Sequence, residues 1–457
     1  MKRYISCVLA VLMALSMLLT ACGSSETPAA DGATGSTGST ADGAAEGEEP
    51  QPVTFRFQWW GSDARHEATL AVIDQYMKEN PHVTIEAEYR GKSDREKVAT
   101  ELVGNQLADL VQLDYDWLGD FTTAGDYFVD LNTLTDIIDM SGFDMEFARS
   151  YGEYNGKLIA LPTGLNANAN IINKTLAEQF DIPTGMDTQW TWEDYLEIGK
   201  TVHEKDANKY FLNADSVTLY FYVLSPYLQQ LTGKEVVGDD YTLGFTAEEL
   251  TQALDYIGKL YEAGVVLPAS EANVFLENPW TNPKWINGDF VTELSLTSTM
   301  PAELQDMPGE GSAFILPMME NAKASGITVY PSQLLGISKE CECVEEVAKF
   351  MNYFYNSEEA GVILKDCRAM PPVEKIRNLC AEQDLLNPAV VQATEYAMAN
   401  PGLKPNSNSG NSEVEEIFIS ACEQIAYAPT DAANIAANTI SQLEKVVEAM
   451  KEEAAAA

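Results

Sequence analysis

Hydrophobic residues after position 52 follow two alternating periods. Short runs rich in Val, Ile, Phe or Trp indicate β-strands, and apolar residues spaced three or four apart indicate helices. The elements predicted in this way are a strand at 53–60, a helix at 64–79, a strand at 83–89, a helix to about residue 106 that opens with a capping box at 93–96, and a strand at 110–113. Strands that alternate with helices predict a parallel sheet covered by helices, and therefore an α/β fold.

Aromatic and charged residues follow the first and third predicted strands. Trp60 and Arg65 come after the first strand, and Asp114, Tyr115 and Asp116 come after the third. Ligands of parallel sheets bind beyond the carboxyl ends of the strands, so these residues are candidates for a binding site. Strand alternation favours Trp60 for the site over its neighbour. The competing structural interpretations are an ion pair for Arg65 and helix capping by the two aspartates.

The start of the chain has the layout of a secretory signal peptide. A basic beginning precedes an apolar run over 4–19, and Thr20-Ala21 precede Cys22. This ending resembles the lipobox of bacterial lipoproteins, which implies removal of residues 1–21 and a lipid on Cys22. An uncleaved signal anchor is the alternative, since about 18 apolar residues can just span a bilayer.

Residues 22–52 are predicted to be the lipidated cysteine followed by a disordered linker. After Cys22 this segment contains no aromatic residue and no Leu, Ile or Val, so it cannot bury enough apolar surface to fold. Its position suits a tether between a membrane and a globular body, although a tail without a function would have the same composition.

Charge and length narrow the class of protein. The chain has 28 Lys and Arg against 70 Asp and Glu, a formal charge of −42. Such a surface repels nucleic acid and anionic lipid, so we expect no nucleic-acid partner and membrane contact through the lipid anchor only. The 405 residues after the linker (457 − 52) exceed one ordinary core and predict two domains.

Cysteine and histidine usage gives no sign of a cofactor, metal or catalytic site. Five cysteines remain after the predicted signal peptide and Cys22, at irregular spacing, which does not form a disulfide framework: Cys341, Cys343, Cys367, Cys380 and Cys422. A bridge between Cys367 and Cys380 stays open. The chain has three histidines, far apart, and neither a phosphate-loop nor a G-x-S-x-G motif. We therefore predict a non-enzyme, with a secreted glycosidase as the remote alternative.

Several short motifs occur in a fixed order along the chain. They are Trp59-Trp60-Gly61, Glu79-Asn80-Pro81, Ala108-Asp109-Leu110, Gly156-Lys157-Leu158, Leu161-Pro162-Thr163-Gly164, Asn173-Lys174, Thr191-Trp192-Glu193-Asp194, Trp285-Ile286-Asn287-Gly288-Asp289 and Leu335-Gly336-Ile337-Ser338-Lys339. This ordered set resembles the family 1 extracellular solute-binding proteins of ABC importers. The chain departs from the family pattern at Ala108, at Ile172 and over 289–293, where the family has small residues; the last departure weakens any transfer of contacts around Ser295.

The resemblance implies a two-lobed, periplasmic-binding-protein-like α/β fold of type II. It implies lobe 1 at 53–162 and 328–356, lobe 2 at 163–327 and 357–457, and hinge crossovers between them. The implied function is to capture a sugar or oligosaccharide by hinge closure and to deliver it to ABC permease subunits. The protein would act as a monomer, lipid-anchored on the outer face of the cytoplasmic membrane of a Gram-positive-type cell. A polyamine or peptide is the alternative ligand.

Sugar recognition requires aromatic rings for the apolar face of the pyranose and polar side chains for its hydroxyls. The complete set of predicted ligand-binding residues is Trp60, Arg65, Asp114, Tyr115, Asp116, Asn166, Tyr222, Trp280, Ser295 and Asn408. A buried aromatic face around Tyr222 and a simple polar turn around Asn408 are the competing interpretations.

Overall fold

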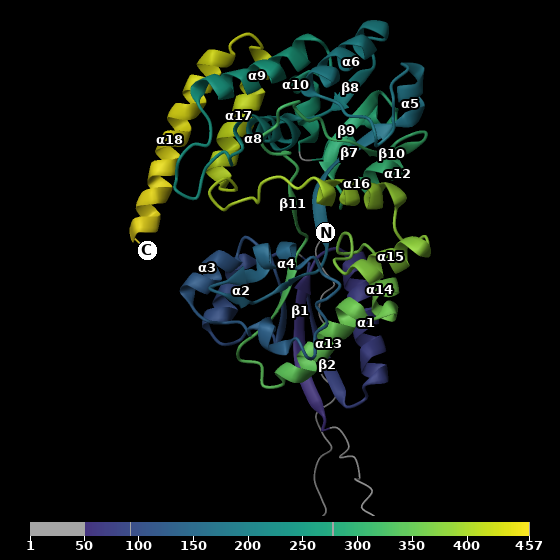
Figure 1. The fold of residues 1–457 in the computed structure, drawn as a ribbon, viewed down its shortest axis with the longest axis vertical. Helices are drawn as coiled ribbons and strands as arrows, with labels where there is room; N and C mark the ends of the chain where they lie inside the picture. Colours follow the sequence, from purple (N-terminus) through teal and green to yellow (C-terminus); the bar gives the residue numbers. More distant parts are fainter. Residues whose placement is uncertain (1–50, 92, 277, 457) are drawn as a thin grey trace, which may run out of the picture. The chain divides into compact units, whose positions relative to one another are not determined.

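The computed structural model describes residues 51–91, 93–276 and 278–456 (Figure 1). The predicted signal peptide and the lipidation site at Cys22 lie outside these residues, as does almost all of the predicted linker. None of the described helices combines the length and hydrophobicity needed to cross a membrane.

The predicted parallel sheet is present at the start of the described chain. It contains β1 (Val53–Trp60), β2 (Val83–Arg90), β3 (Leu110–Leu113), β12 (Leu334–Ile337) and β6 (Leu161–Pro162), in the order β2-β1-β3-β12-β6. β1 is parallel to both β2 and β3, as predicted, and β12 runs antiparallel to β3. Because β1 and β3 are parallel, their carboxyl ends lie at the same edge of the sheet.

Eight helical segments accompany this first sheet, together with the short hairpin β4 (Glu153–Tyr154) and β5 (Lys157–Leu158). The segments are α1 (Asp63–Glu79), α2 (Arg95–Val103), α3 (Leu118–Ala124), η1 (Leu131–Leu134), α4 (Met145–Gly152), α13 (Val344–Asn356), α14 (Glu358–Leu364) and α15 (Glu374–Glu382). We call this sheet and its helices lobe 1. The predicted capping box of α2 does not form: Asp94 caps the helix through Lys97 N, while Ser93 bonds Asp114 instead.

A second sheet forms from later parts of the chain and defines lobe 2. Its strands are β7 (Leu165–Asn173), β8 (Tyr210–Asn213), β9 (Phe290–Leu296) and β10 (Gly311–Phe314), in the order β10-β7-β9-β8, and β11 (Val329–Pro331) pairs with the start of β7. Its helices are α5 (Lys174–Gln179), α6 (Trp192–Lys205), α7 (Ser216–Leu219), the π-helical η2 (Tyr220–Leu224), α8 (Ser225–Thr232), α9 (Ala247–Glu262), α10 (Ala269–Ala272), η3 (Asn273–Phe275), η4 (Pro279–Thr281), α11 (Pro283–Ile286), α12 (Met300–Asp306), α16 (Pro388–Ala399), α17 (Ser412–Tyr427) and α18 (Ala432–Ala456).

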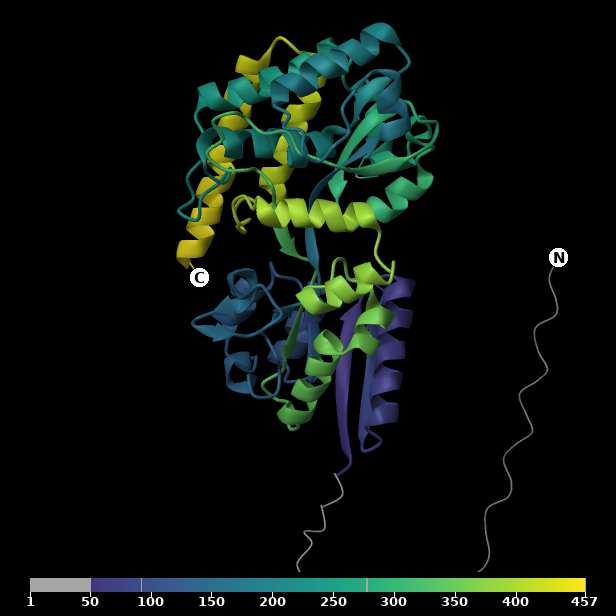
Figure 2. The ribbon, with the colours of Figure 1, turned by 45° about the vertical axis from the view of Figure 1, so that its right-hand side comes forward.

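The chain passes between the two sheets at three places. It leaves lobe 1 between β6 and β7, returns between β11 and β12, and leaves again between α15 and α16 (Figure 2). Our assignment of all residues after 356 to lobe 2 needs correction, because α14 packs against α1 and α15 packs against α13 and α14. The apolar faces of α14 and α15 are buried on lobe 1, so the third crossing follows Glu382.

The five cysteines in the described part of the chain are all free thiols. The bridge between Cys367 and Cys380 that the sequence left open is therefore not formed. Cys380 donates its thiol to Gly361 O at 3.5 Å and is fully buried, as a small apolar residue would be.

Candidate ligand-binding site

Trp60 closes the carboxyl end of β1. Its ring stacks on Trp117 with centroids 5.0 Å apart and planes 28° apart, and its side chain is 6 % exposed. The neighbouring Trp59 is completely buried, as strand alternation predicts. Trp60 therefore lies at the predicted strand end, with little of its side chain accessible.

Arg65 holds together the first turn of α1 and the segment before the third crossing. Its Nε donates to Cys367 O at 3.1 Å and its Nη1 donates to Trp60 O at 3.2 Å. Within the described ranges it forms no ion pair, so the competing interpretation of an Arg65 salt bridge is not supported. Burial lowers the pKa of its guanidinium, and the nearby Asp114 opposes that shift.

Arg368, which the sequence gave no reason to select, lies beside this group. Its side chain is 2 % exposed, donates from Nη2 to Thr69 Oγ1 at 2.9 Å, and donates from Nη1 to Gln112 Oε1. Burial lowers its pKa to about 10. The residue joins α1 and β3 to the segment after α14, and only the tertiary fold brings these three together.

Asp114 and Asp116 follow β3, as predicted. Neither caps the next helix, since the N-cap of α3 is Trp117 and forms no side-chain cap bond. Asp114 accepts a hydrogen bond from Ser93 Oγ at 3.1 Å, and burial together with the charge of Asp116 raises its pKa to about 6. Asp116 is exposed. Both carboxylates therefore remain available to a ligand at this edge of the sheet.

The raised pKa of Asp114 predicts that Asp114→Asn increases the stability of the fold in a pH-dependent way. The folded state binds this proton more tightly than the unfolded state, so Asp114 lowers stability as pH rises from 3.8 to about 6. The substitution should raise the melting temperature above that range and change it little at lower pH. The full pKa shift corresponds to about 3 kcal/mol of unfolding free energy. The expected increase is smaller, because Asp114 is part-exposed and solvent screens its charge. Thermal unfolding across pH measures it, with the exposed Asp74→Asn as the matched control; equal gains at every pH would contradict the assignment.

Three tyrosines meet between lobe 1 and the connecting strand β11. Tyr115 packs edge-on against Tyr151 at 5.3 Å and against Tyr330 at 5.7 Å. Tyr151 donates its hydroxyl to Val329 O at 2.6 Å, and Tyr330 accepts from Asn166 Nδ2 at 3.0 Å. We call these three residues the tyrosine cluster. Only Tyr115 was predicted, because Tyr151 comes from α4 and Tyr330 from β11, and neither position carries a local signal.

Asn166 lies on β7 where the chain enters lobe 2, as predicted. Besides its bond to Tyr330, its Oδ1 accepts from Thr297 Oγ1 at 3.0 Å and from Ser298 N at 3.1 Å. The side chain is 6 % exposed. Its amide therefore links the connecting strands to the end of β9.

The predicted residues of lobe 2 occupy different environments. Tyr222 on η2 and Trp280 on η4 are part-exposed, whereas Ser295 is buried, with its hydroxyl bonded to Thr299 Oγ1 at 2.7 Å and to Glu303. Asn408 is buried and donates to Gly238 O at 2.9 Å. The amide nitrogen of Asn408 is thus already bonded within the protein.

The segment that carries Asn408 reaches the tyrosine cluster through a different residue. Lys404 lies 5.1 Å from the ring centre of Tyr151 and donates to Ser150 O. Burial lowers the pKa of its ammonium group. The segment between α16 and α17 therefore contacts the tyrosine cluster through Lys404, which was not among the predicted residues.

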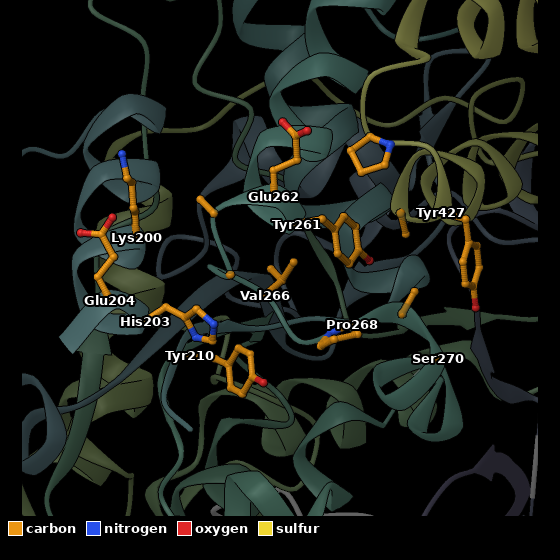
Figure 3. Close-up of a pocket in the computed structure, with 15 residues that line it drawn as sticks. Lys200, His203, Glu204, Tyr210, Tyr261, Glu262, Val266, Pro268, Ser270 and Tyr427 are labelled. Atoms are coloured by element: carbon orange, nitrogen blue, oxygen red, sulfur yellow. The ribbon is translucent and has the colours of Figure 1, made fainter. Parts of the chain in front are cut away.

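A pocket of about 670 Å³ lies elsewhere, in lobe 2 (Figure 3). Its walls come from α6, β8, α9, α10 and the end of α17, and include Tyr210, Tyr261 and Tyr427. None of the predicted ligand-binding residues lines it, and none of its lining residues comes from lobe 1. A ligand held there would not touch both lobes.

Comparison with known proteins decides the family. The model of the bacterial extracellular solute-binding protein family matches residues 62–361. The chain belongs to this family. The match confirms the resemblance drawn from the ordered motifs, and it covers the strands of both sheets except β1, together with the first two crossings between them.

Solved structures share the two-lobed α/β fold. A periplasmic solute-binding protein from Pectobacterium atrosepticum is 25% identical, with a TM-score of 0.74, over 86% of this chain and 98% of that one. An oligogalacturonide-binding protein from Yersinia enterocolitica, in complex with saturated digalacturonic acid, is 20% identical, with a TM-score of 0.71, over 86% and 98%. A Listeria monocytogenes ABC substrate-binding protein, in complex with cycloalternan, is 16% identical, with a TM-score of 0.67, over 87% and 100%. The predicted fold class is confirmed.

Proposed function

We propose that this solute-binding protein captures a carbohydrate between its lobes and delivers it to an ABC permease. The observation that carries the proposal is the tyrosine cluster, in which Tyr115 and Tyr151 of lobe 1 meet Tyr330 of a connecting strand. Aromatic rings beside carboxylates suit a pyranose, which needs both an apolar contact and hydroxyl acceptors. The oligosaccharides bound by the Yersinia and Listeria proteins support the same ligand class.

Hinge closure is the proposed mode of capture. The lobes are joined by three short segments, two of which, at the start of β7 and in β11, pair antiparallel. Bending there would bring Asp114 and Tyr115 toward Tyr222 and Trp280, and a ligand stabilises the closed state only through contacts with both lobes. In this proposal lobe 1 comprises about 53–162 and 332–382, and lobe 2 comprises most of the remainder.

The proposed role is binding without catalysis, at the outside of the cell. The lipid on Cys22 would hold a monomer on the outer face of the cytoplasmic membrane through the linker. That location keeps the captured solute within reach of the permease. The family of binding proteins to which the chain belongs supports this role.

The test is a thermal-shift screen of residues 51–457 against oligosaccharides. A ligand at 100 times its dissociation constant should stabilise the protein by about 2.7 kcal/mol. Tyr115→Ala should weaken binding about tenfold. The substitution removes an aromatic contact worth about 1 kcal/mol and also the packing that orders Tyr151 and Tyr330 in the tyrosine cluster. Tyr427→Ala, at an exposed ring on the lobe 2 pocket, is the matched control and should bind as the parent does.

Two results would reject the proposal. One is the absence of a shift with every sugar, and the other is loss of binding in Tyr427→Ala but not in Tyr115→Ala, which would move the site to the lobe 2 pocket. Hydrolysis of a bound oligosaccharide would revive the glycosidase alternative. Tyr115→Phe separates the ring from the hydroxyl and guards against misfolding of the alanine variant.

A further inference from the structure

Residues 367–370, between α14 and α15 of lobe 1, contact both of the first two crossings between the lobes. Leu165, at the start of β7, pairs antiparallel with Met370. Leu165 N donates to Met370 O at 2.8 Å, and Met370 N donates to Leu165 O at 3.3 Å. Ser332, between β11 and β12, donates its hydroxyl to Arg368 O. We call residues 367–370 the hinge contact segment.

The side chain of Arg368 connects this segment to the carboxyl end of β1. Its Nη2 donates to Thr69 Oγ1 on α1 at 2.9 Å, and its Nη1 donates to Gln112 Oε1 on β3. Gln112 Nε2 donates in turn to Trp60 O at 3.1 Å. Because Trp60 ends β1, one arginine links the place where the candidate site begins to the segment that contacts the crossings.

Arg65 forms a second connection between the same two places. Its Nε donates to Cys367 O at 3.1 Å, and its Nη1 donates to Trp60 O at 3.2 Å. Its main-chain oxygen accepts from Thr69 Oγ1 at 2.7 Å, and that hydroxyl also accepts from Arg368. The hydrogen bonds therefore form a closed ring that includes the first turn of α1.

Packing alone explains the position of Arg368 poorly. Its side chain is 2 % exposed, its Nε is buried without a partner, and none of the ion pairs in the described part of the chain includes it. Arginine is rarely buried in this way without a carboxylate, and an apolar side chain would fill the space without burying a charge.

The backbone of the hinge contact segment is also strained. Ala369 has a φ of 67°, in the left-handed region that residues other than glycine seldom adopt. Such conformations persist only where the surrounding contacts hold them, and they cluster at ligand clamps and switch regions. Here the contacts that hold the segment come from the crossings on one side and from α1 and β3 on the other.

We propose that Arg368 is a positioning residue that couples the candidate site to bending of the crossings. This inference rests on the proposed function and adds the residue through which closure reaches the site. When β7 turns relative to lobe 1, its pairing with Met370 displaces the hinge contact segment, and the ring of hydrogen bonds moves Trp60 and Arg65 with it. By linkage, a ligand that holds Trp60 and Arg65 in their closed positions favours closure by the same free energy.

Hydrogen–deuterium exchange of the ligand-free protein tests the coupling. Arg368→Met removes the guanidinium but keeps a long side chain, so the hinge contact segment loses its anchor on α1 and β3. The amides of Leu165 and Ser332 should then exchange at least about fivefold faster, while the amides of β2 keep the parent's rate. Arg377→Met is the matched control, because this part-buried arginine of α15 donates to Pro371 O at 2.9 Å and should leave the crossings unchanged.

Thr69→Val separates coupling from packing. The substitution keeps the shape of the side chain on α1 and removes the hydroxyl that Arg368 contacts. It should accelerate exchange at Leu165 and Ser332 in the parent and add nothing in the Arg368→Met background, because both changes break the same connection. Additive effects, effects confined to α1 and β3, or unchanged exchange at the crossings in Arg368→Met would overturn the inference.

A saccharide panel distinguishes this inference from the proposed function. The probes are maltotriose, cellotriose and trigalacturonate. A probe that raises the melting temperature should slow exchange at Leu165 and Ser332 in the parent and slow it less in Arg368→Met. Equal slowing in both proteins overturns the coupling and leaves sugar binding intact. If no sugar binds at all, the proposed function fails, and the ligand-free exchange with the Thr69→Val comparison still decides the role of Arg368.

Discussion

Replacing Gly164 with alanine should destabilise the protein strongly. A Cβ at this position would lie 1.8 Å from Arg368 O and 2.8 Å from Ser332 Oγ. Ser332 N donates to Gly164 O at 2.9 Å, and Ser332 Oγ donates to Arg368 O, so the first two connecting segments and the loop after α14 meet at this residue. The obstacle is backbone rather than a flexible side chain, and we expect a loss of about 3 kcal/mol or more.

Thermal unfolding with and without ligand measures the effect. Gly91→Ala is the matched control, because a Cβ there would meet nothing within 4 Å. The Gly164 variant should also bind ligand more weakly, since the segments that must bend for closure would be displaced. A melting temperature equal to that of the control would show that Gly164 is less tightly packed against Ser332 and Arg368 than described.

Trp285→Ala should produce the second large loss, whereas Trp280→Ala should not. Trp285 is completely buried and donates from Nε1 to Glu303 O at 3.1 Å, which anchors α12. Removing such a side chain costs about 3–5 kcal/mol through lost burial and the cavity left behind. Trp280, five residues earlier, is part-exposed.

The two tryptophan variants therefore form their own comparison. Chemical denaturation should show a lower midpoint for Trp285→Ala, and ligand titration should show weaker binding for Trp280→Ala at nearly unchanged stability. Trp285→Phe should recover part of the loss. A reversal, in which Trp280→Ala unfolds the protein and Trp285→Ala does not, would contradict the burial that separates them.

Lobe 1 was predictable because its elements carry local signals. The spacing of hydrophobic residues and the helix-breaking residues predicted β1, β2 and β3 with the helices between them. The alternation of strands and helices then predicted a parallel sheet. The strand β7 shows why lobe 2 was harder. Its sequence, LNANANIIN, alternates like a half-exposed strand, yet all nine residues are buried. Asn170 Nδ2 donates to Ile315 O at 2.8 Å, a long-range hydrogen bond that no local sequence pattern predicts.

The candidate site divides in the same way. Asp114, Tyr115 and Asp116 were predicted because a strand end is a local feature with a known place in the fold. Tyr330 and Arg368 were not, because they reach the site only when the chain returns to lobe 1.

The amide of Asn166 has a consequence for how the molecule can move. One side of the group holds Tyr330 on β11, and the other holds Thr297 and Ser298 after β9. Neither connecting strand can rotate alone without breaking these bonds, which are buried or part-buried. The two strands are therefore expected to rotate together, so that the lobes open and close about a single hinge axis.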